Sequence, residues 1–552
     1  MVQLKPISSL EKCFLDEGLD AHPRCDRFLM YQNERLSFQV AVFNDDLTEM
    51  RAPLATVSLG GELAKYASVR QVVSVPSVLP TIQANIDDRY LRTAPGLYPD
   101  LLQPLQYRGK LPLNMGHLMS LWVDVELDGA LSAGEYSLTL SLAYRKKKED
   151  FTAETAVTVR VLPAALPKQQ LIHTEWFYTD CLAQYYHTRA FSERHWKIIE
   201  RFVETAAKNG INMILTPIFT PELDTYVGGE RMTTQLVGIK QAGDDYRFDF
   251  SLLDRWVDMC MEKGIEYFEF PHFFSQWGSK HTPKIVVEVD GKKKKRFGWH
   301  TDALSDEYRA FIDAFLPALI EYLKQKGIDK KSYFHVSDEP SEKHLAQYKA
   351  CREMLSKHLS DYPMVDALSH VEFYDSGVVS KPIPHIRDIK PFLERNIDGL
   401  WAYYCSWNGN GQGFTDRLMS MPLSRTRILG IQLYLYRVEG FLNWGYNYYN
   451  NCNSYDRVNP FMDTTGGLFG TSGDAFIVYP GNDDEPWESI RLNALREAVD
   501  DMRALALCES RHGRDFTENL VREVAGMEIT FFDYPEQAEF FLKLRERLAS
   551  VL

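Results

Sequence analysis

Two adjacent carboxylates, Asp338 and Glu339, end a short β-prone run at 333–337 and are followed directly by Pro340. Proline lacks a backbone N–H and fixes its φ angle, so the strand is expected to stop here and leave both acids at its C-terminal tip. Neighbouring carboxylates resist simultaneous ionisation, which can keep one of them protonated near neutral pH. A protonated carboxyl beside an anionic partner suits the cleavage of a glycosidic bond. The same residue types are common in surface turns, so the pair alone leaves catalysis and a solvated turn as equal alternatives.

The composition is that of an ordinary globular chain and argues against several classes of partner. Hydrophobic residues make up 45% and charged residues 25% of the 552 positions, as in typical globular proteins. The formal net charge of −14 argues against nucleic acid as a partner. No apolar stretch of about 18 residues is present, so no membrane-spanning helix is expected.

The cysteines and the first residues of the chain predict a cytoplasmic location. The eight cysteines are scattered, without the spacing of zinc ligands or of a disulfide framework, which favours reduced thiols. The N-terminal segment lacks the apolar region of a secretory signal peptide. Neither a metal nor another cofactor is predicted.

Residues 1–165 show the pattern of an all-β domain. Runs such as 36–43, 120–127 and 136–142 alternate in polarity or are rich in β-forming residues, and a last run covers 156–162. Several short strands separated by turn signals predict a β-sandwich.

Between residues 166 and 480, strand-like runs alternate with helical stretches, as in a (β/α)8 TIM barrel. The eight expected strands are 171–178, 211–216, 265–271, 332–337, 363–367, 377–380, 399–405 and 440–446. The helices expected between them include 192–208, 250–263, 306–326, 341–359 and 414–436. Residues 481–552 predict C-terminal helices, at 485–508 and 533–550, that pack on the barrel.

Residues 285–297 predict a β-hairpin inside the third β-to-α connection. Its lysine-rich second half could recognise an anion, but such a run is more often a solvated turn.

If these strands are correct, their C-terminal ends meet around one site. Carboxylates within a ring of Trp and Tyr are the expected lining of a sugar-binding cleft. Besides Asp338 and Glu339 as catalytic residues, the substrate-binding candidates are Glu175, Trp176, Asp180, His272, Trp277, Tyr403, Tyr404, Trp407, Trp444 and Tyr446. Other strand-end residues expected near the site are Tyr178, Phe219, Asp224, Glu269, Asp366, Asn443 and Asn447. For any single aromatic or histidine, core packing is the more common role.

The seventh strand lacks the acid that a two-carboxylate mechanism needs. Many retaining barrel glycosidases place a nucleophilic carboxylate there, about 5 Å from the acid of the fourth strand. Residues 399–407 contain no Asp or Glu. This absence favours substrate-assisted cleavage, in which the 2-acetamido group of the sugar is the nucleophile. Both acids can face the site only if the chain bulges or turns near Asp338, since successive strand residues point to opposite sides.

Several stretches of the chain resemble glycoside hydrolase family 123, the β-N-acetylgalactosaminidases, and related bacterial proteins. The matching stretches are HTEWFYTDCLA (173–183), NMILTPIFTPELDT (212–225), FDFSLLDRWVDMC (248–260), FHVSDEP (334–340), LWAYYCSW (400–407) and RTRILGIQLYLYRVEGFLNWGYNYYN (425–450). The resemblance implies a β-sandwich ahead of a TIM barrel, a retaining substrate-assisted mechanism and no metal. By motif position, Glu339 resembles the family's general acid/base and Asp338 its acetamido-orienting residue.

Three functions remain open from the sequence. The first is removal of terminal β-linked N-acetylgalactosamine from a glycan or glycoconjugate. The second is a glycosidase of another specificity on the same scaffold, and the third is a carbohydrate-binding protein without activity. The sequence does not distinguish GalNAc from GlcNAc, and a homo-oligomer is left open.

Overall fold

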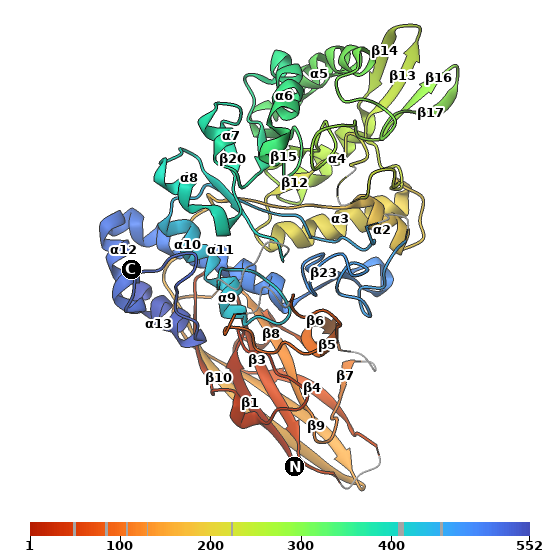
Figure 1. Cartoon of the computed structure of the whole chain (residues 1–552). Helices are drawn as coiled ribbons and strands as arrows, with labels where there is room; N and C mark the ends of the chain where they lie inside the picture. The colour runs from red at the N-terminus through yellow and green to blue at the C-terminus, as the bar shows by residue number, and fades with distance from the viewer. Residues whose placement is uncertain are drawn as a thin grey trace.

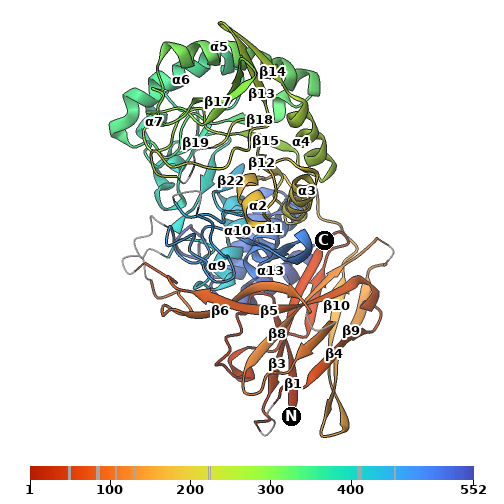
Figure 2. The ribbon, with the colours of Figure 1, turned by 90° about the vertical axis from the view of Figure 1, so that its right-hand side faces the viewer.

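The computed structural model combines β-sheets at the N-terminus, alternating strands and helices in the middle and helices at the C-terminus (Figure 1). It describes residues 1–47, 51–82, 87–105, 109–129, 131–221, 223, 225–406, 413–452 and 456–552. In both views the C-terminal helices lie between the N-terminal sheets and the middle part of the chain (Figures 1 and 2). Among the described residues, no helix has the length and hydrophobicity needed to cross a membrane.

Two five-stranded sheets form the N-terminal part. The first has the order β1 (Val2–Ser8), β3 (Arg35–Asn44), β8 (Leu118–Glu126), β5 (Ala67–Ser77) and β6 (Gly96–Pro104). The second has the order β2 (Arg27–Met30), β10 (Glu149–Val161), β9 (Gly134–Lys146), β4 (Leu54–Gly60) and β7 (Lys110–Pro112). Residues of β9 alternate between buried and exposed positions, because one face of the sheet packs on the core and the other meets water. One buried cluster takes side chains from both sheets, including Phe38, Val123 and Leu140.

Six short parallel strands form a curled sheet in the middle of the chain. Its order is β18 (Ser332–Phe334), β15 (Tyr267–Phe270), β12 (Met213–Leu215), β11 (Ile172–Glu175), β22 (Gly440–Asn443) and β21 (Trp401–Tyr403). The four central strands contain almost no exposed residue, as expected where helices cover a parallel sheet.

A separate two-stranded parallel sheet joins β19 (Val365–Ala367) and β20 (Lys381–Ile383). Isolated bridges link it to the six-stranded sheet on both sides, Phe334 with Met364 and His385 with Tyr403.

Of the helices that follow these strands, those at 193–208, 251–262, 306–326 and 345–359 lie close to expected positions, whereas the short helices at 179–185, 372–375 and 390–394 were not expected. The helices are α2 (Thr179–Tyr185), α3 (Glu193–Lys208), α4 (Ser251–Glu262), α5 (Asp306–Lys326), α6 (Leu345–Leu359), α7 (Glu372–Asp375), α8 (Lys390–Glu394), α9 (Leu423–Arg427) and α10 (Leu429–Leu435). Ser192 and Ser305 cap α3 and α5 by accepting backbone N–H groups of the first turn, which satisfies donors that have no partner within the helix.

The expected hairpin at 285–297 is confirmed, because β16 (Ile285–Val289) pairs antiparallel with β17 (Lys292–Phe297). Strands β13 (Gly238–Ala242) and β14 (Asp245–Asp249) extend it to a four-stranded sheet.

Two expected elements are wrong in position. Residues 377–380 are not a strand, because the N–H groups of Val378 and Val379 bond to the carbonyl of Phe373 within α7. Residues 414–422 are not helical, since Pro422 takes an extended conformation and α9 begins only after it.

The last part of the chain contains β23 (Val478–Pro480), β24 (Pro486–Glu488), α11 (Ile490–His512), α12 (Arg514–Ala525) and α13 (Ala538–Ala549). A second buried cluster joins Tyr31, Trp122 and Leu162 of the N-terminal part to Leu505 and Phe541 of α11 and α13.

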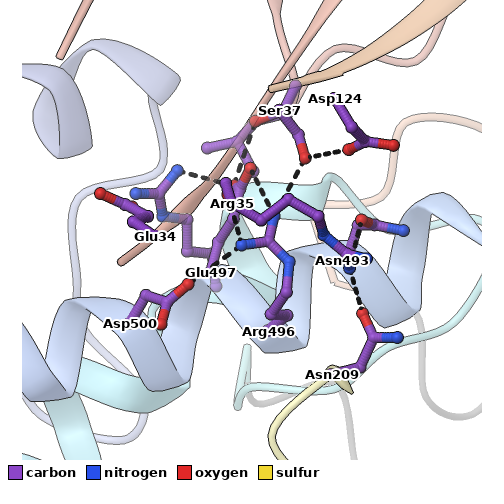
Figure 3. Close-up of polar contacts among 12 residues, drawn as sticks. Glu34, Arg35, Ser37, Asp124, Asn209, Asn493, Arg496, Glu497 and Asp500 are labelled. Atoms are coloured by element: carbon purple, nitrogen blue, oxygen red, sulfur yellow. Dashed lines mark hydrogen bonds and ion pairs between the residues drawn. The ribbon is translucent and has the colours of Figure 1, made fainter. Parts of the chain in front are cut away.

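Polar contacts reinforce this junction (Figure 3). Arg496 of α11 donates to the carbonyl oxygen of Arg35 at 2.6 Å and to Ser37 Oγ at 3.0 Å. Ser37 in turn donates to Asp124 Oδ1 at 2.6 Å. The N-terminal sheets and the C-terminal helix therefore share both apolar and charged contacts.

Candidate active site

A cavity of about 340 Å³ lies where the C-terminal ends of several strands meet. Six of the residues predicted for the site line it: Trp176, Trp277, Asp338, Glu339, Tyr403 and Trp444. They follow β11, β15, β18, β21 and β22 in the chain or belong to them. The edge of the curled sheet thus brings together side chains that are far apart in the sequence.

An irregular backbone lets both acids reach the cavity. Strand β18 already ends at Phe334, and Glu339 adopts a left-handed conformation with φ of +42°. The turn is held by the Glu339 N–H, which donates to the carbonyl of Ala367 at 3.1 Å, and by the Trp277 N–H, which donates to that of Asp338 at 3.0 Å. A left-handed non-glycine residue costs free energy and occurs both in turns and at active sites, where the surrounding structure holds it in place.

The surroundings of Glu339 favour its protonated form. Burial raises the pKa of the Glu339 carboxyl, while hydrogen bonds from Tyr403 and Trp277 and the charge of Arg387 act in the opposite direction; the pKa remains above its usual value of 4.5. The Tyr403 hydroxyl donates to Glu339 Oε1 at 2.7 Å. A carboxyl that keeps its proton to higher pH is suited to act as a general acid.

Aromatic side chains form much of the remaining wall. Trp444 packs edge-to-face against Phe469, with ring centroids 5.6 Å apart, and Trp176 is almost fully buried at the base. At the mouth, Trp277 and Tyr226 are 44% and 57% exposed. Such rings offer flat faces that can stack on the C–H groups of a sugar.

Beneath Trp176 lies a buried polar network. The Trp176 indole N–H donates to Glu269 Oε1 at 2.8 Å, and the same oxygen is 2.6 Å from His335 Nε2. His335 Nδ1 is 3.2 Å from Asp366 Oδ1, which accepts the N–H of Val336 at 3.0 Å. Burial lowers the pKa of His335, but its two carboxylate partners outweigh this and raise the pKa to about 9.

Several acids expected at the site are buried elsewhere in structural contacts. Glu175 is paired with Arg417, and Asp180 forms two bonds of 2.8 and 2.9 Å with Arg231. Glu269 and Asp366 belong to the buried network and are not in the cavity wall. Glu175 ends β11 as expected, but Asp180 lies in α2, and Glu269 and Asp366 lie within β15 and β19. Salt bridges and hydrogen bonds turn all four side chains away from the cavity.

Other expected residues also lie outside the cavity wall. Tyr404 and Tyr446 are fully buried, and the Tyr446 hydroxyl donates to the carbonyl of Phe202 at 2.8 Å. His272 is buried beside Trp176, and Phe219 packs among phenylalanines of the core. The remaining expected side chains with structural contacts are Tyr178, Asn443 and Asn447. Trp407 and Asp224 lie outside the described residues.

The cavity contains residues that the sequence did not single out. They are Tyr226, Ala367, Cys405, Leu442, Cys452, Leu468 and Phe469. Ala367, Cys405 and Leu442 lie within expected strands, so strand position was a usable signal. Cys452, Leu468 and Phe469 come from the long connection between β22 and β23, where no periodicity or motif pointed to the site.

The family model for the catalytic domain of glycoside hydrolase 123 matches residues 176–508. The chain belongs to glycoside hydrolase family 123. The matched region includes the cavity and both acids and continues into α11. Family 123 membership supports glycoside hydrolase activity.

A solved structure agrees with this assignment over the full length. A family 123 glycoside hydrolase from Clostridium perfringens, described for glycolipid glycan hydrolysis, is 15% identical, with a TM-score of 0.72; the match covers 100% of this chain and 97% of that one. At this identity the match shows a shared fold. A β-glucuronidase from Parabacteroides merdae is 11% identical, and the match covers 80% of this chain and 48% of that one with a TM-score of 0.27. A match this weak supports no inference. No curated protein matches the chain.

Proposed function

We propose that this family 123 protein removes terminal β-linked N-acetylgalactosamine from a glycan or glycoconjugate by a retaining, substrate-assisted mechanism. One observation carries the proposal: among the described residues that line the cavity, Asp338 and Glu339 are adjacent and no other carboxylate is present. An enzyme with its own nucleophile needs a second acid across the cavity from the proton donor. Here the acetamido group of the substrate would supply the nucleophile.

In this mechanism Glu339 is the general acid and then the general base. Its raised pKa keeps the proton available for the leaving oxygen. After the aglycone leaves, the carboxylate accepts a proton from the water that opens the oxazolinium intermediate. The hydrogen bond from Tyr403 holds the carboxyl in one orientation.

Asp338 is proposed to orient the acetamido group. A carboxylate can accept the acetamido N–H and balance the positive charge that forms on the oxazolinium ring. Trp176, Trp277, Tyr403 and Trp444 are proposed to bind the sugar, since all four line the same cavity.

The catalytic region is proposed to be a (β/α)8 barrel over 166–480, preceded by a β-sandwich at 1–165 and followed by helices at 481–552. The bridges that connect the β19–β20 pair to both ends of the six-stranded sheet support the barrel. Buried residues shared by the two N-terminal sheets support the sandwich.

The experiment that tests the mechanism compares aryl β-glycosides that differ only at C2. A 2-acetamido substrate should be cleaved at least about a hundredfold faster than its 2-hydroxy analogue, because well-placed intramolecular groups have very high effective molarities. Comparison of galacto and gluco substrates in the same panel tests the sugar. A stoichiometric covalent adduct on a carboxylate after treatment with a 2-fluoro sugar would overturn the mechanism, and no cleavage of any glycoside would overturn the activity.

A further inference from the structure

Three buried side chains meet below the cavity, at the ends of three neighbouring strands. His272 follows β15, His335 follows β18 and Asp366 belongs to β19. Each side chain has one nitrogen or oxygen atom that could bind a metal, and these three atoms lie within 4.8 Å of one another. The two imidazole rings have centroids 4.3 Å apart and are inclined by 34°.

His272 stands out among the buried histidines of the described residues. It is 4% exposed, yet neither ring nitrogen has a hydrogen-bond partner. The buried rings of His173, His195 and His385 all contact polar atoms. A buried polar atom without a partner is costly, so both nitrogens of His272 call for an explanation that the proposed mechanism does not give.

The neighbours of His335 and Asp366 already orient both side chains. Glu269 Oε1 lies 2.6 Å from His335 Nε2, which leaves Nδ1 facing Asp366. A carboxylate on the far nitrogen is the usual support of a metal-binding histidine. Asp366 is itself held by the Val336 N–H and the Tyr348 hydroxyl. Glu269 and Asp366 bring two negative charges, which one divalent cation would balance.

We propose that His272, His335 and Asp366 bind a divalent transition-metal ion such as Zn²⁺. Two histidine nitrogens and one carboxylate oxygen are a known set of three ligands for this ion, and water would take the fourth tetrahedral position. The 3.2 Å between His335 Nδ1 and Asp366 Oδ1 is close to the edge of about 3.3 Å expected for tetrahedral ligands about 2.0–2.1 Å from Zn²⁺. When the ion binds, the proton on His335 Nδ1 is released to solvent.

The role of this ion is structural. None of its ligands lines the cavity. Strand β18 and the residues after it are already linked to the β19 segment by the bridge of Phe334 with Met364 and by the N–H groups of Val336 and Glu339. The ion would join β15, β18 and β19 just before the turn that carries Asp338 and Glu339. This inference does not rest on the proposed glycosidase mechanism, and it replaces the expectation of a metal-free protein.

Metal analysis of the full-length protein tests the site. After expression with added Zn²⁺ and extensive dialysis, we expect about one equivalent per chain by mass spectrometry, and visible d–d absorption after replacement by Co²⁺. His272→Phe keeps a ring against Trp176 but should lose the bound equivalent, whereas His117→Phe, at an exposed histidine, should keep it. Glu269→Gln should weaken Zn²⁺ affinity about 10–100-fold.

The wild-type protein alone can overturn the proposal, so it remains testable if a variant does not fold. Dialysed protein without stoichiometric metal and without Co²⁺ bands would show that the cluster binds no ion. Full retention of the metal by His272→Phe would place the ion elsewhere. A substrate panel that fails while the metal is present would contradict only the glycosidase proposal.

Discussion

At the scale of single residues, the environment of Glu339 gives the clearest indication of a general acid in the molecule. Its backbone is held in a left-handed turn, its carboxyl is partly buried, and Tyr403 donates to one of its oxygens. The hydrogen bond from Tyr403 fixes the direction of the carboxyl and lowers its pKa, but burial outweighs it and the pKa stays above its usual value. They lead to three predictions about individual side chains.

Glu339→Gln should lower kcat by about 10²–10⁴-fold on a substrate with a poor leaving group, because general acid catalysis typically accelerates the reaction by this factor. Steady-state kinetics with an alkyl glycoside measures the loss. A nitrophenyl glycoside serves as the control, since its leaving group needs little protonation and the first step should be less affected. Near wild-type turnover of the alkyl glycoside would remove Glu339 from the acid role.

Asp338→Asn should reduce kcat more than it raises KM. The amide can still form a hydrogen bond, but it does not balance the charge of the oxazolinium in the transition state. Loss of an interaction made mainly in the transition state appears in kcat. If only KM changed, Asp338 would be a ground-state binding residue.

Tyr403→Phe should move the alkaline limb of the pH profile to higher pH. The Tyr403 hydrogen bond lowers the pKa of Glu339 by stabilising the carboxylate. Without it the pKa rises, so the acid keeps its proton to higher pH and activity falls later as pH increases. The pH dependence of kcat/KM reports this pKa in the free enzyme. An alkaline limb at the same or a lower pH would show that another group controls it.

At the scale of elements, short strands deliver residues to the cavity while buried ion pairs fix the connections between them. Asp180 lies in α2, and its two bonds to Arg231 hold the connection that also carries Tyr226. Arg231 donates further to the carbonyl of Leu223 at 2.8 Å and stacks on Tyr178. Asp180 therefore supports the cavity mouth from outside its wall.

Asp180→Asn should lower the free energy of unfolding by about 3–5 kcal/mol, because it leaves the buried charge of Arg231 without its partner. Urea unfolding measures the change. The matched control is Glu193→Gln, which breaks a two-bond pair with Arg255 on the exposed surface and should leave the midpoint nearly unchanged. Reduced substrate affinity with unaltered stability would instead place Asp180 in contact with the substrate.

The sequence predicted which runs form strands better than it predicted where the strands end or where their side chains point. The proline after Glu339 and the alternation of strands with helices located the acids and all expected strands except the sixth. The sixth was wrong because the carbonyl of Phe373 in α7 accepts the N–H groups of two valines, a contact that no local pattern encodes. Similarly, Glu175 and Asp180 were predicted as site residues from the local sequence. Their carboxylates are instead paired with Arg417 and Arg231, which are distant in the chain.

At the scale of the whole molecule, the N-terminal sheets are bound to the rest of the chain by buried charge as well as by apolar contacts. Arg491 of α11 forms two bonds of 2.7 and 2.9 Å with Asp100 of β6, and both side chains are fully buried. Glu488 accepts from Arg70 at 2.6 Å and from Asn209 at 2.7 Å. The N-terminal sheets are therefore expected to unfold together with the catalytic region.

Glu488→Gln should destabilise both parts at once, by about 3–5 kcal/mol at neutral pH, because Arg70 and Arg35 lose a buried counter-charge. Burial raises the pKa of Glu488, but the two arginines outweigh it and hold the pKa well below the usual 4.5. The stabilisation is therefore present above about pH 4.5 and is lost as pH falls toward the lower, folded-state pKa. The difference in the free energy of unfolding between wild type and variant should therefore become smaller at acid pH.

Differential scanning calorimetry, which detects the unfolding of every part of the chain, measures this coupling together with residual activity after heating. The two midpoints should coincide in the wild type and fall together in Glu488→Gln. Glu135→Gln, which breaks the exposed pair of Arg27 with Glu135, should leave both nearly unchanged. Separate midpoints in the wild type would show that the junction does not couple the two parts. If the destabilisation by Glu488→Gln did not change with pH, the charge of Glu488 would not be what stabilises the junction.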